Sequence, residues 1–274
     1  MVSANLGLAH YLGTPFFSKG WGGTKLDLLE SMVKQLFPEA HCQNWPPTAV
    51  QPMWKTIWET NSSCLREGVF RTKCDERLVD ALPPENHNAG VAFLTPKNIT
   101  PEKMSCMVHL AGTGDHTFER RLWLGGPLLK NNIANMVLES MQGGAKLQCV
   151  SGLLLLGKAT IDEARSLLYS LQAEAGYGKM GICGLSIGGV HAVRDGGIPS
   201  SYTNCYTAIS HFALCREDAA QKTGVTIEEV IDRLRSVLSL TEVTRFPVPK
   251  NPQTVIFVGA TDDGYIPIIP YIQS

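Results

Sequence analysis

The sequence predicts an α/β protein, with a mostly parallel sheet covered by helices on both faces. Short apolar segments, such as residues 104–110 and 180–183, alternate with longer segments of helical periodicity. Buried parallel strands are near-continuous apolar runs, because helices cover both faces of their sheet. This alternation therefore favours a doubly covered parallel sheet over an all-helical or all-β fold.

The composition is that of an ordinary globular protein: the 274 residues are 44% hydrophobic and 18% charged. We expect one domain, in which residues 1–89 form an N-terminal extension with the first strands and residues 90–274 form the core. A net charge of -1 gives no basic surface for nucleic acid. The eight cysteines have no regular spacing, so we expect no zinc site, no other metal and no disulfide framework. No apolar run approaches the ~20 residues of a membrane span.

The expected elements follow in chain order. Thr24 is a suitable N-cap for a helix that ends at Pro38. Short strands are expected at residues 68–71 and 91–94, and the strand at 104–110 runs into a glycine turn.

The second half of the sequence predicts three further elements. Apolar residues from Ile161 to Leu171 mark one face of a helix that Gly176 closes. Thr226 begins a capping box that starts another helix. Residues 254–258 predict a buried strand, and residues 203–240 are the expected lid.

The strongest chemical signal is the segment Gly184-Leu185-Ser186-Ile187-Gly188-Gly189, a GxSxGG between a strand and a small-residue segment that can start a helix. In a nucleophile elbow the serine sits on a strained strand-to-helix turn, where flanking side chains would collide with backbone. A bare GxSxG also occurs by chance as a glycine-rich turn. The strand before it favours the elbow, with Ser186 as the nucleophile.

A second glycine segment, Gly112-Thr113-Gly114-Asp115, follows an earlier strand. Such a loop supplies one backbone N–H to the oxyanion, and the residue after the nucleophile supplies the other. We therefore predict Thr113 and Ile187 as the oxyanion donors. The alternative is a phosphate-binding loop, but the segment has neither a Walker A lysine nor a complete GxGxxG.

The acid of a serine triad is expected after the nucleophile, at the carboxyl end of a strand. Asp263 is our prediction and Asp262 the fallback, since both follow the strand at 254–258. Either residue by itself could simply cap a turn. None of the seven histidines follows Asp263. His191 and His211 are not where the base belongs, so we expect both to be structural or pocket residues, and the sequence to stop before the catalytic histidine.

Several segments resemble the α/β-hydrolase domain-containing protein 18 family, a branch of the α/β hydrolases. The resemblance covers residues 17–22, 109–116 with Arg120 and Arg121, 176–189, and 263–267. It implies an α/β-hydrolase fold whose last strand and helix are missing here, a Ser186 nucleophile, an Asp263 acid and a histidine in an absent segment.

The resemblance also implies a function. The family is lipid-directed, so the expected substrate is a small-molecule acyl or lipid ester, with no cofactor, an intracellular and mitochondrial location, and peripheral membrane contact. His116, Arg120 and Arg121 follow the oxyanion loop and are candidates for an anionic head group, although an exposed basic pair is more often a solvated face. Two alternatives stay open: a catalytically incomplete lipid-binding module, and an acyltransferase with the same residues.

Overall fold

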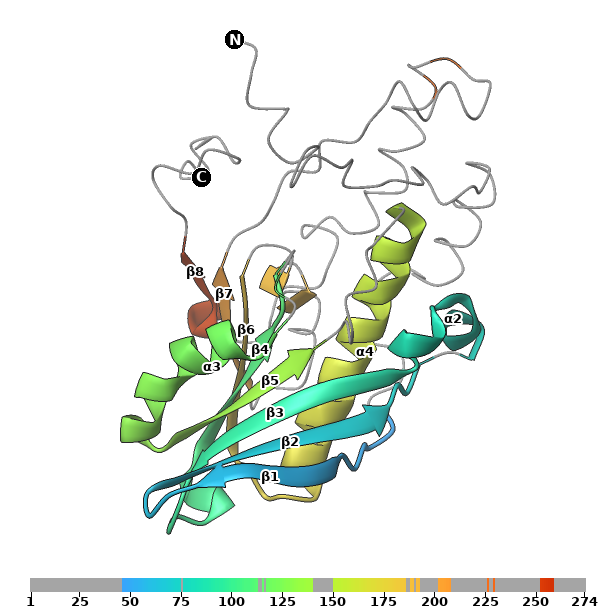
Figure 1. The fold of residues 1–274 in the computed structure, drawn as a ribbon. Coiled ribbons are helices and arrows are strands. Elements are labelled where there is room, and N and C mark those ends of the chain that lie inside the picture. The colour runs from blue at the N-terminus through green and yellow to red at the C-terminus, as the bar shows by residue number, and fades with distance from the viewer. Residues whose placement is uncertain are drawn as a thin grey trace, which may run out of the picture.

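The computed structural model describes residues 46–74, 76–112, 115, 117–139, 150–185, 188–189, 191–192, 202–207, 226, 229 and 252–258. Within these residues, eight strands form one sheet in the order β1-β2-β3-β5-β4-β6-β7-β8 (Figure 1). Strands β1 to β3 are an antiparallel meander, and β3 pairs antiparallel with β5. The remaining strands, in the sheet order β5-β4-β6-β7-β8, are parallel to one another. The strands are β1 (Met53–Glu59), β2 (Ser63–Arg71), β3 (Asn88–Pro96), β4 (Ser105–Leu110), β5 (Ile133–Glu139), β6 (Lys179–Gly184), β7 (Tyr202–Thr207) and β8 (Ile256–Val258).

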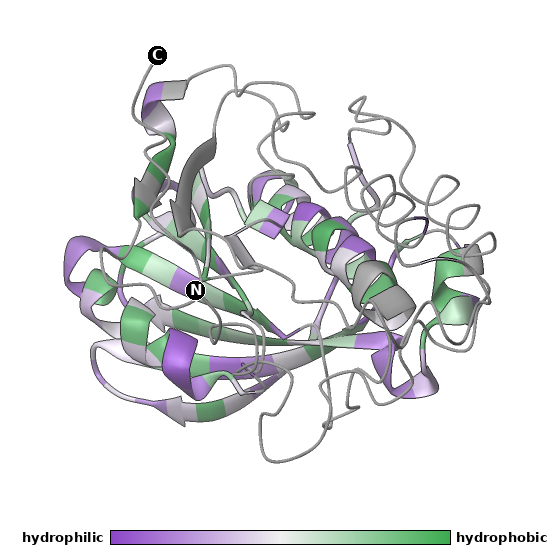
Figure 2. Ribbon diagram, turned by 90° about the horizontal axis from the view of Figure 1, so that it is seen from above, coloured by the Kyte–Doolittle hydropathy of each residue, from purple (hydrophilic) through white to green (hydrophobic). Residues whose placement is uncertain are grey.

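Helices cover both faces of this sheet (Figure 2). On one face α4 buries Ala164, Leu167 and Leu168 in the main apolar core, together with the inward residues of β3 to β6. On the other face Leu122 of α3 packs on a smaller cluster that includes Leu65 and Val137. The helices are α2 (Glu76–Ala81), α3 (Glu119–Gly125) and α4 (Val150–Ala173), and the 3-10 turns are η2 (Pro84–Asn86), η3 (Pro101–Lys103), η4 (Gly126–Asn131) and η7 (Pro252–Thr254). Among the described helices, none combines the length and apolar character of a membrane span.

Most expected elements are present where the sequence placed them. Strands β2, β3, β4 and β6 contain or closely match the four predicted segments. Helix α4 begins earlier than its apolar face suggested, and Gly176 follows its end with a φ of +78°. The backbone N–H of Glu229 donates to the Thr226 hydroxyl at 3.2 Å, so the predicted N-cap is formed. The helix expected from Thr24 lies outside the described residues.

Two expectations require correction. Strand β8 is not buried, because it is the last strand of the described sheet and Ile256 and Val258 are about half exposed. Residues 203–207 are not the start of a lid, because they pair with β6 and β8 within β7. The expected boundary between residues 89 and 90 of the single domain lies within β3, which pairs with β2 and β5. Strands β1 and β5 were not expected, since a fully exposed edge strand and a strand with a central Asn135 lack the uninterrupted apolar pattern.

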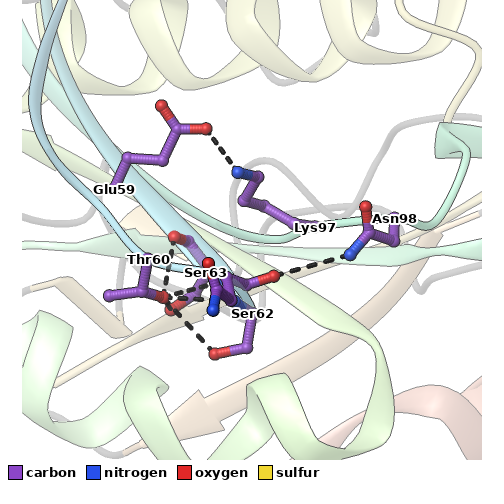
Figure 3. A network of polar contacts seen from close by, with 7 residues as sticks. Glu59, Thr60, Ser62, Ser63, Lys97 and Asn98 are labelled. Atoms are coloured by element: carbon purple, nitrogen blue, oxygen red, sulfur yellow. Dashed lines mark hydrogen bonds and ion pairs between the residues drawn. The ribbon is translucent and has the colours of Figure 1, made fainter.

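A polar network closes the turn between β1 and β2 and fixes the end of β3 against it (Figure 3). The Thr60 hydroxyl accepts hydrogen bonds from the backbone N–H groups of Ser62 (3.2 Å) and Ser63 (3.0 Å). The Lys97 backbone N–H donates to the Ser62 carbonyl at 2.9 Å, and the Lys97 ammonium pairs with Glu59. This corner anchors the antiparallel half of the sheet, away from the carboxyl ends of the parallel strands.

A buried carboxyl group joins α4 to the segment after β2. Glu163 is 3% exposed, and its Oε1 lies 2.6 Å from the Thr72 hydroxyl oxygen. The Thr72 hydroxyl oxygen also lies 3.3 Å from the carbonyl oxygen of Asn86, which can only accept a hydrogen bond. A hydroxyl has one proton to donate, so both contacts are satisfied when Glu163 carries its own proton. Burial raises the pKa of Glu163 to about 8, and the Thr72 hydrogen bond opposes this shift.

We expect this group to make the protein less stable as the pH rises. In the unfolded chain the carboxyl loses its proton near pH 4.5, whereas the folded protein keeps it up to about pH 8. The folded state therefore binds more protons in this window, and the free energy of unfolding falls by up to about 1.4 kcal/mol per pH unit. Denaturant titrations between pH 5 and 8 should show a shallower decline for Glu163→Gln than for the wild type. The exposed Glu174→Gln is the control, and equal slopes in all three proteins would contradict the assignment.

Candidate active site

The structure brackets Ser186 with a strand and a helix, as a nucleophile elbow requires. Strand β6 ends at Gly184, and helical residues are present at 188, 189, 191 and 192. The backbone N–H of Gly188 donates to the Leu185 carbonyl at 3.0 Å, which closes a tight turn. The chain therefore reverses between a strand end and a helix start around this serine.

The two glycines that flank Ser186 are required by close backbone contacts. A Cβ atom on Gly184 would lie 2.0 Å from the Gly188 carbonyl oxygen and 2.5 Å from the Gly189 nitrogen. A Cβ atom on Gly188 would lie 2.6 Å from the Ala111 carbonyl oxygen. Such contacts exclude any side chain, because a backbone cannot move aside as the tip of a side chain can. The GxSxG pattern is thus a steric requirement of this turn.

The loop after β4 lies directly against this turn. In addition to the contact of Gly188 with Ala111, a Cβ atom on Gly112 would lie 2.9 Å from the Leu185 carbonyl oxygen. The backbone of the glycine loop and the backbone of the turn around Ser186 therefore contact each other at two places. The glycine loop and the strand-to-helix turn form one unit, although more than 70 residues separate them in the sequence.

A buried ion pair anchors the far side of the glycine loop. The Asp115 backbone N–H donates to the Gly112 carbonyl at 3.2 Å, and Asp115 Oδ2 lies 2.9 Å from Arg121 Nε. The two side chains are only 5% and 4% exposed. The Arg121 guanidinium also donates to the carbonyl oxygens of Leu138, at the end of β5, and of Thr117, at 3.0 Å. Burial lowers the pKa of Arg121, and the charge of Asp115 opposes this.

These contacts correct the role expected for Arg121. Its guanidinium is buried and engaged with Asp115 and two backbone carbonyls, so it holds the loop instead of facing a ligand. Arg120, the other member of the pair, is exposed. The sequence indicated no separate role for Asp115. An acid five residues before a basic pair is the signal that could have suggested the ion pair.

The three segments that carry the predicted chemistry leave the sheet at one edge. Strands β4, β6 and β8 are mutually parallel through β7, so their carboxyl ends point the same way. The first leads to the glycine loop, the second to Ser186 and the third to Asp262 and Asp263. Ligand sites of open parallel sheets lie at this edge. Thr113, His116, Ser186, Ile187, Asp262 and Asp263 lie outside the described residues.

His191 lies on the helix after the turn and contacts α4. A Cβ atom on Gly157 of α4 would lie 2.8 Å from His191 Nε2, so the imidazole packs closely over this glycine. This position agrees with the structural role expected from the sequence. His211 lies outside the described residues. Within the part of the chain that the structure describes, no group of three or more His, Cys, Asp or Glu side chains could hold a metal ion.

Substitution of Gly184 should show whether the turn depends on backbone contact. We expect Gly184→Ala to lower the free energy of unfolding by at least about 1–3 kcal/mol, the usual cost of overpacking. Gly126→Ala is a matched control, since its φ of -50° and ψ of -47° are helical and its Cβ atom would meet nothing within 4 Å. Chemical denaturation of both variants measures the difference. A Gly184→Ala protein as stable as Gly126→Ala would refute the close contact.

The neighbouring arginines allow a second test. Arg121→Ala leaves the Asp115 carboxylate buried without its partner, which should cost about 3–5 kcal/mol of stability. Arg120→Ala removes the same side chain from an exposed position and should change stability by less than about 0.5 kcal/mol. Thermal and denaturant unfolding of the two variants provide the comparison. Equal effects would show that the buried ion pair does not anchor the loop.

Comparison with solved structures supports the fold. The chain is similar to an acetyl xylan esterase from Paenibacillus sp. R4, with a TM-score of 0.53 and 14% identity over 82% of this chain and 76% of that one. It is also similar to acetyl xylan esterase 1 from Thermoanaerobacterium sp., with a TM-score of 0.46 and 11% identity over 80% of this chain and 73% of that one. From the first comparison we take only the α/β-hydrolase fold, and we draw no conclusion from the second.

The family comparison covers nearly the whole chain. The model of the family described as "Alpha/beta hydrolase domain containing 18" matches residues 14–198 and 200–271. These ranges include the glycine loop, the turn around Ser186, and Asp262 and Asp263. The match agrees with the resemblance found in the sequence, and with the sheet order and the strand-to-helix turn. The chain belongs to the α/β-hydrolase domain containing 18 family.

Proposed function

We propose that the protein is a serine hydrolase that cleaves an acyl ester, with Ser186 as its nucleophile. The observation that carries this proposal is the double backbone contact between the glycine loop and the turn around Ser186. Thr113 directly follows Gly112, and Ile187 directly precedes Gly188. Gly112 contacts Leu185, and Gly188 contacts Ala111. Because consecutive Cα atoms are 3.8 Å apart, these two contacts support our proposal that the two oxyanion donors lie close to one another.

The proposed reaction is acyl transfer to water. The Ser186 hydroxyl oxygen attacks the ester carbonyl carbon, and its proton passes to a histidine that Asp263 orients. The N–H groups of Thr113 and Ile187 stabilise the oxyanion, each contributing about 2.7–4 kcal/mol. The histidine returns the proton to the departing alcohol, and water then hydrolyses the acyl-enzyme by the same steps. No histidine of this sequence has the position expected for the base, so none is assigned to that role.

An acyl lipid is the proposed substrate class. Helix α3, which follows the glycine loop, exposes Trp123 (78%) and Leu124 (50%) beside the exposed Arg120. An aromatic and aliphatic pair beside a cation suits the interface between lipid tails and anionic head groups. We propose that Arg120 and His116 contact such a head group, and that Arg121 holds the loop. Peripheral contact with a membrane surface and an intracellular, mitochondrial location belong to the same proposal.

A fluorophosphonate probe tests the nucleophile directly, because it phosphonylates activated serines. We expect the full-length protein to take the label, Ser186→Ala to lose it completely, and Asp263→Asn to react about 10⁴-fold more slowly. Ser63→Ala, at the start of β2, is the control for loss of a serine at an unrelated site.

Two outcomes would count against the proposal. Label retained in Ser186→Ala would assign the reactivity to another residue. A folded full-length protein that takes no label and turns over no short-chain or long-chain ester would instead favour a non-catalytic lipid-binding module.

A further inference from the structure

A line of buried and partly buried polar side chains crosses the sheet on its α3 side, from the carboxyl ends of β6 and β4 to the first half of β5. Cys183 Sγ lies 3.1 Å from His109 Nδ1, and His109 Nε2 lies 3.1 Å from Asn135 Oδ1. His109 is 5% exposed and Asn135 is completely buried. We refer to Cys183, His109 and Asn135 as the polar relay. The mechanism proposed above does not use any of the three.

The hydrogen bonds of Asn135 determine which way the relay is directed. Its Nδ2 donates to the carbonyl oxygens of Gly125 (2.9 Å) and Ile133 (3.1 Å). Its Oδ1 therefore faces His109, and an amide oxygen only accepts hydrogen bonds. It follows that His109 Nε2 carries a proton and donates it to Asn135.

The other ring nitrogen of His109 then acts as an acceptor. Burial lowers the pKa of His109. The hydrogen bond to Asn135 opposes this shift, and the nearby charge of Arg121 adds to it. A neutral imidazole with its proton on Nε2 has a free lone pair on Nδ1. The Cys183 thiol thus donates to Nδ1, and the relay runs in one direction from β6 through β4 to β5 and the end of α3.

The relay lies immediately below the two loops of the candidate site. His109 and Cys183 are direct neighbours in the register of β4 and β6. One residue further along, Leu110 begins the segment whose carbonyl oxygens contact Gly188, and Gly184 begins the turn around Ser186. A side-chain clamp between the strands at this level therefore fixes the spacing of the glycine loop and the nucleophile turn.

We infer that Cys183, His109 and Asn135 are positioning residues, which hold the glycine loop at the distance from Ser186 that oxyanion stabilisation requires. This inference rests on the proposed serine hydrolase function. Apolar residues would fill the same space, but they would not specify direction or distance, whereas a fully satisfied buried polar network does. The cost of burying the polar groups of His109 and Asn135 is offset because each finds a partner.

Cys106 provides an internal comparison. It lies on β4, like His109, and is almost completely buried, but it belongs to the apolar core on the α4 side. Burial raises the pKa of its thiol well above the usual range. Loss of either thiol should remove buried contacts, but only Cys183 is part of the relay.

The test compares Cys183→Ala, Cys183→Ser and Cys106→Ala in the full-length protein, using the rate of fluorophosphonate labelling at Ser186 and the thermal midpoint. Cys183→Ala removes the donor to His109, and we expect labelling to slow by about 10- to 100-fold, as small misplacements of reacting groups do. The hydroxyl of Cys183→Ser still donates, so this variant should label near the wild-type rate. Cys106→Ala should lower the thermal midpoint without slowing the labelling.

An independent readout is the imidazole ¹⁵N spectrum of His109. We expect the neutral form protonated at Nε2 in the wild type and in Cys183→Ser. A charged ring or the opposite tautomer would overturn the directed relay. Wild-type labelling rates in Cys183→Ala would overturn the positioning role alone. A wild-type protein that takes no label would overturn the proposed function, and with it the positioning role that rests on it.

Discussion

The site depends on one steric constraint, the contact of two backbone segments with no side chain between them. Gly112 meets the Leu185 carbonyl, Gly188 meets the Ala111 carbonyl, and Gly184 leaves room for the turn to close on itself. Each contact would be lost if a single Cβ atom intervened. Because the segments come from different strands, the contact also requires that β4 and β6 be neighbours in the correct register, which the sheet provides.

The two faces of the sheet are stabilised by different kinds of interaction. The α4 face is an apolar core, formed by residues such as Val108, Leu138 and Ile182, and it supplies most of the burial that stabilises the domain. The α3 face is smaller and contains the Asp115–Arg121 pair and the polar relay. Directional interactions on this face fix loop geometry, since hydrogen bonds specify distance and orientation where apolar contacts specify only proximity.

The topology explains why residues so far apart meet. An antiparallel meander, β1 to β3, extends one end of the sheet, and the parallel strands from β5 to β8 direct their carboxyl ends to one edge (Figure 1). Every segment that follows one of these strands must begin at that edge. The glycine loop and the segments that lead to Ser186 and Asp263 thus begin at the same edge, although they are far apart in the sequence. Helix α3, with its exposed Trp123, follows the glycine loop in the chain.

The sequence by itself determined the fold class, strands β4 and β6, helix α4 and the turn around Ser186, because apolar periodicity and glycine spacing are local signals. It did not indicate β1 or β5, the exposure of β8 or the burial of Arg121. These depend on which strands become neighbours and which face a helix covers. Arg120 and Arg121 are adjacent and chemically identical, yet one is exposed and the other is paired with Asp115 beneath α3. Only tertiary structure could distinguish them, because burial and partners are properties of the packed chain and not of a residue and its sequence neighbours.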